Sequence, residues 1–255
     1  MSLKGVIHGA LRLAGLRLVR TNPAGLSEPD WSLRQILTGL EISVVFDVGA
    51  HVGQYATRLR RLGYRGRIVS FEPQEAAFAA LHKETTSDPQ WEALRTALGD
   101  REGEQVLNIS RNSVSSSFLP VAPAILQVEP SIDKVGTETV PVDTLDRLYS
   151  RFAGSSDSIL LKIDAQGYEA NILAGAQELL ACCSAVQLEM SLFPVYRGQK
   201  RFPEMMRLML DRGFEMVHLE RGFSDGDTGY LIEVDGVFVR KDKIAGAFAG
   251  DRAID

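Results

Sequence analysis

Short apolar runs alternate with helix-like segments along most of this chain. Residues 44–48, Val-Val-Phe-Asp-Val, are rich in β-branched side chains, which is typical of a parallel strand buried on both faces. Further strands are predicted at 67–73, 91–98, 158–163, 185–190, 214–219 and 236–240, and helices at 54–62, 74–83, 167–180 and 202–212. This alternation predicts an α/β fold with a mostly parallel seven-stranded sheet and helices on both faces. The last two strands are expected to form a hairpin, which makes the last strand antiparallel.

The N-terminal residues are predicted to precede the sheet as a separate extension. Residues 21–30 contain two prolines and a glycine and are interpreted as a connector, followed by a helix at 31–40 with Asp30 as its N-cap. We therefore expect an N-terminal helical extension at 1–40 and one domain at 41–255.

The middle of the chain departs from regular alternation. An additional strand is expected at 104–109, and the proline-containing stretch 120–137 is interpreted as irregular chain that can serve as a mobile lid. A short strand within 138–146 is expected to lead into a helix capped by Asp143 or Thr144.

A glycine turn follows the first predicted strand and opens a helix. Asp47 lies near the carboxyl end of the strand, where open α/β sheets bind ligands, and Gly49 and Gly53 bracket a turn that contains Ala50 and His51. The spacing G-x-x-x-G does not match the dinucleotide fingerprint, and no phosphate-loop sequence is present. One hypothesis is a site for S-adenosyl-L-methionine (SAM), whose ammonium suits an acid and whose carboxylate suits the turn amides. The alternative is an ordinary strand-to-helix turn with a capping aspartate.

The second strand ends in another acid at a suitable offset. Glu72 follows Ser70 and precedes Pro73, 25 positions after Asp47, near the roughly 20-residue offset of a ribose-binding acid. A carboxylate there accepts hydrogen bonds from both ribose hydroxyls; the alternative is a solvated acid at a strand end. At the end of the third strand, Leu98 is expected to flank the adenine ring. Asp100 is expected either to reach the exocyclic amine of adenine or to cap a turn.

Four motifs taken together resemble the FkbM-type methyltransferases. They are Asp47-Val48-Gly49-Ala50-His51-Val52-Gly53, Ser70-Phe71-Glu72-Pro73, Ala97-Leu98-Gly99-Asp100 and Leu161-Lys162-Ile163-Asp164-Ala165-Gln166-Gly167-Tyr168-Glu169. The resemblance extends over about 44–239. It implies a SAM-dependent O-methyltransferase of the Rossmann-like class that occupies 41–255 and acts on a hydroxyl of a sugar or other secondary metabolite. The predicted cofactor-binding residues are Asp47, Gly49, Ala50, His51, Gly53, Ser70, Glu72, Pro73 and Leu98.

The fourth strand ends in the candidate catalytic groups. Lys162 and Asp164 are two residues apart, so both side chains face the same side of the strand. A lysine on an apolar strand needs a partner, and Asp164 or Glu189, at the end of the fifth strand, is the expected one. We predict Asp164, Lys162 and Glu189 as catalytic residues, with Asp164 deprotonating the acceptor hydroxyl or holding the oxyanion. In one alternative Asp164 and Glu189 ligate a divalent cation such as Mg²⁺, and in another the lysine–carboxylate pair only stabilises the site.

Other polar residues have weaker claims. His51 is interpreted as a turn residue rather than a base, and His218 is a minor candidate for a general base. The hydroxyl-rich patch 112–117 is either a flexible loop or a contact for the methionine tail or the acceptor, and 191–199 is either an ordinary loop or a sugar-gripping one.

Composition narrows the class of partner and the compartment. The chain has 255 residues and a net charge of −5, so nucleic acid is an unsuitable partner and a small-molecule or glycan acceptor is expected. The adjacent Cys182 and Cys183 suggest buried thiols in a reducing, cytoplasmic compartment. Residues 3–20 mix apolar and basic side chains and are expected either to pack on the domain or to contact the inner membrane surface peripherally.

These patterns favour a SAM-dependent O-methyltransferase of a sugar, glycolipid or related secondary metabolite. An N-methyltransferase is the alternative among enzymes, and a degenerate methyltransferase fold that serves as a non-catalytic binding subunit is the alternative from another class.

Overall fold

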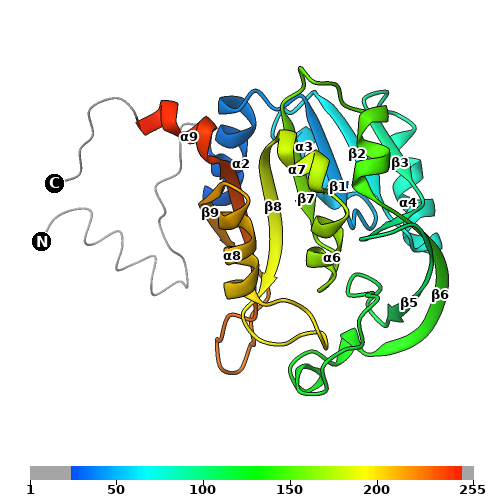
Figure 1. The fold of residues 1–255 in the computed structure, drawn as a ribbon. Helices are drawn as coiled ribbons and strands as arrows, with labels where there is room; N and C mark the ends of the chain where they lie inside the picture. The colour runs from blue at the N-terminus through cyan, green and yellow to red at the C-terminus, as the bar shows by residue number, and fades with distance from the viewer. Residues whose placement is uncertain (1–23, 249–255) are drawn as a thin grey trace, which may run out of the picture.

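A seven-stranded sheet in the order β3-β2-β1-β7-β8-β10-β9 forms the centre of the computed structural model, which describes residues 24–248 (Figure 1). Its strands are β1 (Val44–Val48), β2 (Arg67–Phe71), β3 (Trp91–Leu94), β7 (Ile159–Ile163), β8 (Cys183–Ser191), β9 (Phe214–Arg221) and β10 (Glu233–Arg240). β10 is antiparallel to both of its neighbours, whereas β1, β2, β3, β7 and β8 are mutually parallel. The predicted fold class is confirmed, including the antiparallel last strand and its hairpin with β9.

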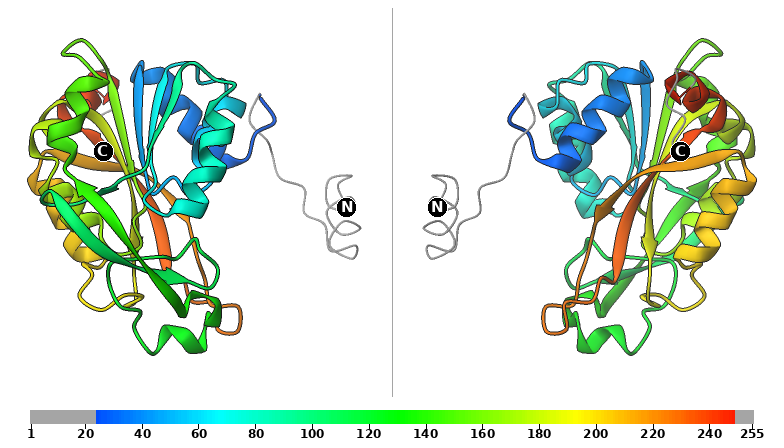
Figure 2. Two further views of the ribbon diagram at one scale, coloured as in Figure 1. Left: turned by 90° about the vertical axis from the view of Figure 1, so that its right-hand side faces the viewer. Right: turned by 90° about the vertical axis from the view of Figure 1, so that its left-hand side faces the viewer.

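Helices cover both faces of this sheet (Figure 2). One face is covered by α2 (Glu28–Gly39), α3 (Gln54–Arg61) and α4 (Glu75–Thr85), which pack against Val45 and Leu160 of the sheet. The opposite face, which includes Phe46 and Leu161, is covered by α5 (Leu145–Leu148), α6 (Glu169–Ala174), α7 (Gln177–Cys182) and α8 (Phe202–Asp211). Because successive strand residues point to opposite faces, both faces need apolar side chains, which explains the continuous apolar runs of the central strands.

The helix expected at 31–40 begins earlier than predicted and belongs to the main core. Its N-cap is Ser27, whose hydroxyl accepts a hydrogen bond from the backbone N–H of Asp30 at 3.3 Å, so the predicted cap at Asp30 is wrong. Leu33 and Leu37 of this helix, α2, are buried in the same cluster as β1. Residues 3–20, with their predicted packing or membrane contact, lie outside the described residues. Among residues 24–248, no helix combines the length and apolar character needed to cross a bilayer.

A second, three-stranded sheet lies beside the carboxyl edge of the first and was not expected. It has the order β4-β6-β5, with β4 (Ala97–Leu98), β5 (Gly103–Ser110) and β6 (Lys134–Asp143). The single strand predicted at 91–98 is therefore wrong: β3 pairs with β2, whereas β4 pairs with β6. The residues of β4 pair with residues of β6 that lie 45 positions later in the chain, a tertiary contact that local apolar character does not reveal.

Two further segments differ from the predicted boundaries. The helix expected at 167–180 is broken into α6 and α7 at Gly175, where a Cβ would overlap the carbonyl oxygen of Gly99. The stretch 120–137 contains two 3₁₀ helices, η1 (Ile125–Gln127) and η2 (Pro130–Ile132), and its last residues already belong to β6. After β6, the cap of α5 is Thr144, one of the two predicted residues.

Candidate active site

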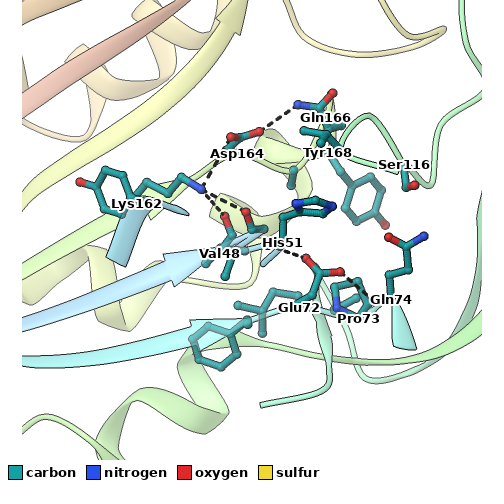
Figure 3. A pocket seen from close by; sticks show the side chains of 18 of the residues that line it. Val48, His51, Glu72, Pro73, Gln74, Ser116, Lys162, Asp164, Gln166 and Tyr168 are labelled. Atoms are coloured by element: carbon teal, nitrogen blue, oxygen red, sulfur yellow. Dashed lines mark hydrogen bonds and ion pairs between the residues drawn. The ribbon is translucent and has the colours of Figure 1, made fainter. Parts of the chain in front are cut away.

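The carboxyl ends of β1, β2 and β7 border a cavity of about 460 Å³, within the usual range for small-molecule sites (Figure 3). Its wall includes the turn after β1, the end of β2, the end of β7 and residues 113–117, here called the serine loop. The cavity is large and well formed because these parallel strands end at one edge, where the chain must turn back over the sheet.

Gly49 allows two of these turns to approach each other closely. Its φ is +72°, and a Cβ there would overlap the carbonyl oxygen of Asp164. The N–H groups of Gly49 and Ala50 donate to the carbonyl oxygen of Phe71 at 3.0 and 3.1 Å. These two amides are therefore bound to β2, so they are not the free donors for a carboxylate that the sequence suggested.

Gly53 serves the packing of α3 rather than the lining of the cavity. It is the N-cap of α3 with φ +92°, and a Cβ there would lie 2.8 Å from the Trp91 ring. The indole N–H of Trp91 donates to the hydroxyl of Ser70 at 3.0 Å, and Ser70 donates to Asp47 Oδ2 at 3.2 Å. These contacts hold the turn after β1 in place from the side of the protein core.

Glu72 lines the cavity and also holds the loop around it. Its Oε2 accepts from the backbone N–H of His51 and its Oε1 from that of Gln74, both at 2.8 Å. Burial raises the pKa of this carboxyl to about 7. Each carboxylate oxygen has a second lone pair, so Glu72 can still accept hydrogen bonds from a ligand in the cavity.

Lys162, in the cavity wall, forms a buried ion pair with Asp47, which lies behind the wall. The Nζ–Oδ1 distance is 3.1 Å, and Asp47 is fully buried. Lys162 Nζ also donates to the backbone oxygens of Val48 and Gly49 at 3.3 and 3.1 Å. Burial alone would lower the pKa of Lys162, but the charges of Asp47 and Asp164 outweigh it and hold the pKa above its usual value. The expected partner Asp164 is present at 3.7 Å, whereas Glu189 contacts Gln166 instead.

Gln166 joins Asp164 to Glu189. Its Nε2 donates to Asp164 Oδ1 at 2.9 Å and to Glu189 Oε2 at 2.8 Å, while its Oε1 accepts from the Tyr196 hydroxyl at 2.8 Å. The Asp164 side chain remains 34% exposed, toward the cavity. Figure 3 shows Asp164 between the Lys162 amine and the Gln166 amide.

The serine loop forms part of the cavity wall and contacts the turn after β1. Ser113 lies 3.0 Å from His51 Nε2, and Gln54 lies 3.1 Å from His51 Nδ1, so both ring nitrogens of His51 have partners. Burial lowers the pKa of His51, which favours a neutral ring in the cavity wall.

The cavity has an apolar part and a polar part. The apolar part is lined by Phe71, Leu98, Leu107, Phe118, Tyr168 and Ile172, and the polar part by Tyr55, Lys162, Asp164, Gln187 and Asp235. Such a division suits an elongated ligand with a flat apolar ring at one end and polar groups at the other.

A family model described as the methyltransferase FkbM domain matches residues 47–216. The chain belongs to this family. The resemblance indicated by the four sequence motifs is thereby confirmed, and the matched residues contain the turn after β1, Glu72, Lys162, Asp164 and Glu189.

The individual proteins that resemble this FkbM-family chain share only low sequence identity with it. The 2-O-methyltransferase NoeI of Sinorhizobium fredii (strain NBRC 101917 / NGR234) is 26% identical over 204 residues, which are 76% of this chain and 83% of that protein. An rRNA methylase from Streptococcus thermophilus has a TM-score of 0.47 at 9% identity, over 84% of this chain and 98% of its own. Magnesium protoporphyrin IX methyltransferase (ChlM) from Synechocystis PCC 6803, solved with bound SAM, has a TM-score of 0.43 at 11% identity, over 94% and 98%. At these scores, neither solved structure bears on the function.

The structure brings most of the predicted site residues of this FkbM-family chain to one cavity. Gly49, Ala50, His51, Glu72, Pro73, Leu98, Lys162 and Asp164 line it, whereas Asp47, Gly53, Ser70 and Glu189 contact residues behind the lining. The roles of these residues in binding and catalysis stay predictions. His218 lies beside Glu28 on α2 at 4.0 Å, and neither it nor the exposed Asp100 lines the cavity.

Several cavity residues were missed by sequence reasoning. Gln166 lies inside the fourth motif, but nothing in that motif shows that its amide joins two carboxylates. Asp235 could have been recognised from the sequence, because Glu233 and Asp235 are two positions apart in an otherwise apolar stretch and so face the same side of a strand. Burial raises the pKa of Glu233 to about 7 and that of Asp235 to about 6. Within residues 24–248, no three or more His, Cys, Asp or Glu side chains are grouped so that they could hold a metal ion.

Proposed function

We propose that this FkbM-family protein is a SAM-dependent O-methyltransferase that methylates a hydroxyl of a sugar, glycolipid or related secondary metabolite. The observation that carries the proposal is the convergence of Glu72, the apolar pocket around Leu98, and Asp164 on one cavity. The name of the relative NoeI, a 2-O-methyltransferase, supports oxygen as the methylated atom.

The residues of the cavity fit SAM. The ring of Tyr168 and the side chains of Leu98 and Phe118 offer apolar surface for adenine. Glu72 has free lone pairs for the ribose hydroxyls, and its pKa of about 7 allows the carboxyl to ionise near neutral pH. The volume of about 460 Å³ leaves room for an acceptor beside such a ligand.

When bound, SAM supplies a methyl group that is already activated on a sulfonium. The protein must then orient the acceptor oxygen and take its proton. Asp164 is suited to this, because its carboxylate is partly exposed to the cavity and lies beside the Lys162 cation. In the proposed step, the acceptor hydroxyl would pass its proton to Asp164 as its oxygen bonds to the methyl group, while the methyl–sulfur bond of the donor would break and the sulfur would leave as a neutral thioether.

Lys162 has a supporting role in this proposal. Its ammonium is surrounded by Asp47, Asp164 and two backbone oxygens, so its N–H groups already have hydrogen-bond acceptors. It places a positive charge beside these two carboxylates and anchors the end of β7 to the end of β1. The Mg²⁺ alternative for Asp164 and Glu189 remains a prediction, to be tested by chelation.

Two measurements test the proposed function in sequence. Calorimetry should detect micromolar SAM binding, and the absence of binding at millimolar SAM would favour a non-catalytic binding subunit. Transfer of labelled methyl from SAM to a panel of methyl glycosides, glycolipids and amines should then label oxygen in the sugar-containing acceptors. Labelling confined to the amines would replace the proposal with N-methylation.

A further inference from the structure

Gln166 has a hydrogen-bonding partner for every polar group of its side chain. The two hydrogens of its amide are directed at Asp164 Oδ1 and Glu189 Oε2, at 2.9 and 2.8 Å, and its amide oxygen accepts from Tyr196. If the amide were turned over, its oxygen would face the Asp164 carboxylate and that hydrogen bond would be lost. The orientation of the amide is therefore determined by its neighbours.

The backbone of Gln166 is constrained as well. Its φ of +54° lies in the left-handed region, which non-glycine residues adopt only where the surroundings impose it. Its carbonyl oxygen accepts a hydrogen bond of 2.6 Å from Ser117 of the serine loop. The single hydrogen of the Tyr196 hydroxyl is shared between the Gln166 amide oxygen and the carbonyl oxygen of Ser115 in the same loop. Gln166 thus connects the serine loop to Asp164, which directly follows β7.

A neutral donor is the suitable residue type at this position. The Glu189 carboxyl faces Asp164, Glu233, Asp235 and Glu169, and burial together with these charges raises its pKa well above its usual value. Lys162 is a cation on the far side of Asp164, at 3.7 Å from Oδ2. One amide with two N–H groups can satisfy Asp164 and Glu189 at once without adding charge to the group.

We propose that Gln166 is a positioning residue. Its amide orients the carboxylate of Asp164 toward the acceptor hydroxyl and keeps the carboxyl group of Glu189 apart from that of Asp164. This inference rests on the proposed function, in which Asp164 takes the proton. With Oδ1 held by Gln166 and Oδ2 beside Lys162, the carboxylate plane of Asp164 is set from both sides. Its remaining lone pairs are available to a ligand in the cavity.

Replacing the amide by a chain of equal length tests this role. Gln166→Met keeps the backbone and volume but removes all three side-chain bonds. With SAM and the methyl glycosides as substrates, kcat should fall about ten- to hundredfold while KM for SAM stays within a factor of two, because misplacing a proton acceptor by about 1 Å has that effect. Gln177→Met, on the exposed side of α7, is the matched control and should not change kcat. Wild-type kcat in Gln166→Met would overturn the proposal.

A second readout needs no acceptor. Carbon-13 NMR of the labelled carboxyl groups should show Glu189 titrating at higher pH in Gln166→Met than in the wild type, because the amide hydrogen bond favours the ionised form. An unchanged titration would show that the amide of Gln166 does not hydrogen-bond Glu189 in solution and would also overturn the proposal. If Gln166→Met does not fold, Tyr196→Phe removes the bond that orients the amide and should shift kcat and the titration in the same directions, by less.

Failure of the proposed function gives a different pattern. A wild-type protein that binds SAM but methylates no acceptor would overturn the proposed function by itself. The Glu189 titration would still decide whether the amide of Gln166 governs this pair of carboxyl groups.

Discussion

Lys162 and Asp47 are directly opposite each other on the adjacent parallel strands β7 and β1, and their ion pair of 3.1 Å is buried on one face of the sheet. Lys162 lines the cavity next to Asp164 and the turn after β1, and Asp47 lies immediately behind it. The pair therefore connects the stability of the sheet to the geometry of the site, and the two can be separated by substitution.

Breaking this pair should be costly. Lys162→Met removes the cation and leaves Asp47 buried with Ser70 as its remaining side-chain donor, which should lower the free energy of unfolding by about 3–5 kcal/mol. Denaturant titration followed by circular dichroism measures the change. The control is Glu102→Gln, which breaks the half-exposed ion pair with Arg147 and should cost no more than about 1 kcal/mol. Equal small losses in both variants would contradict a role for the buried pair.

Glu72 should contribute to SAM binding more than to folding. Glu72→Ala removes the acceptor for the ribose hydroxyls and should weaken SAM binding about ten- to hundredfold by calorimetry, since hydrogen bonds to a charged group contribute about 1.5–3 kcal/mol. In the wild type, affinity should rise as the pH passes through about 7, where the buried carboxyl ionises. Glu75→Ala makes the same charge change at an exposed neighbouring position and should leave the affinity unchanged. A flat pH dependence would exclude Glu72 as a ligand.

Gly49 should tolerate no side chain. Gly49→Ala combines an unfavourable φ of +72° with overlap between the new Cβ and the carbonyl oxygen of Asp164, so this variant should be much less stable and should lose SAM binding. Gly63→Ala is the control for the backbone term alone, because its φ is +93° but no atom lies within 4 Å of the added Cβ, and it should cost about 1–2 kcal/mol. Similar melting temperatures for the two variants would show that the close contact of the two turns is unimportant.

Asp164 should be required for turnover but not for cofactor binding. Asp164→Asn keeps the size of the side chain and removes its basicity, so kcat should fall about 10²–10⁴-fold, the usual contribution of a general base, with little change in the SAM dissociation constant. Activity in the presence of a strong chelator distinguishes proton acceptance by Asp164 from the alternative in which Asp164 binds Mg²⁺. Loss of activity with recovery on adding Mg²⁺ would assign Asp164 to metal binding, whereas unchanged activity would exclude that role.

Stability should fall as the pH rises toward neutrality. The pKa values of Glu72, Glu169 and Glu233 are raised by burial to about 7, and that of Asp235 to about 6. A raised carboxyl pKa means that the folded state binds protons more tightly than the unfolded chain. This contribution is fully present below about pH 4 and is lost as the pH rises through 6 to 7.

Denaturant titrations between pH 5 and pH 8 measure this trend. Glu233→Gln removes one of the raised groups and should flatten the dependence, while keeping an oxygen that can accept from Ser191. A stability that increased over this interval would contradict the assignment of these carboxyl groups as buried acids.

The fold class was determined by local pattern. The β-branched run at 44–48 and its counterparts require strands that are buried on both faces, and the intervening helical periodicity requires helices to bury them. The glycine turn and Glu72 could also be predicted from sequence, because a strand end followed by a turn places side chains at one edge of a parallel sheet whatever the details of packing.

Partners within the site were decided by tertiary structure. Lys162 was expected to pair with Asp164 or Glu189, but its shortest ion pair is with Asp47, 115 positions earlier, because β7 lies next to β1 in the sheet. Likewise, β4 left the main sheet to pair with β6, and Gln166 became the contact between two carboxylates. Strand order and register determine which side chains meet, and they depend on contacts between distant segments. Apolar periodicity records only which face of its own element a residue occupies.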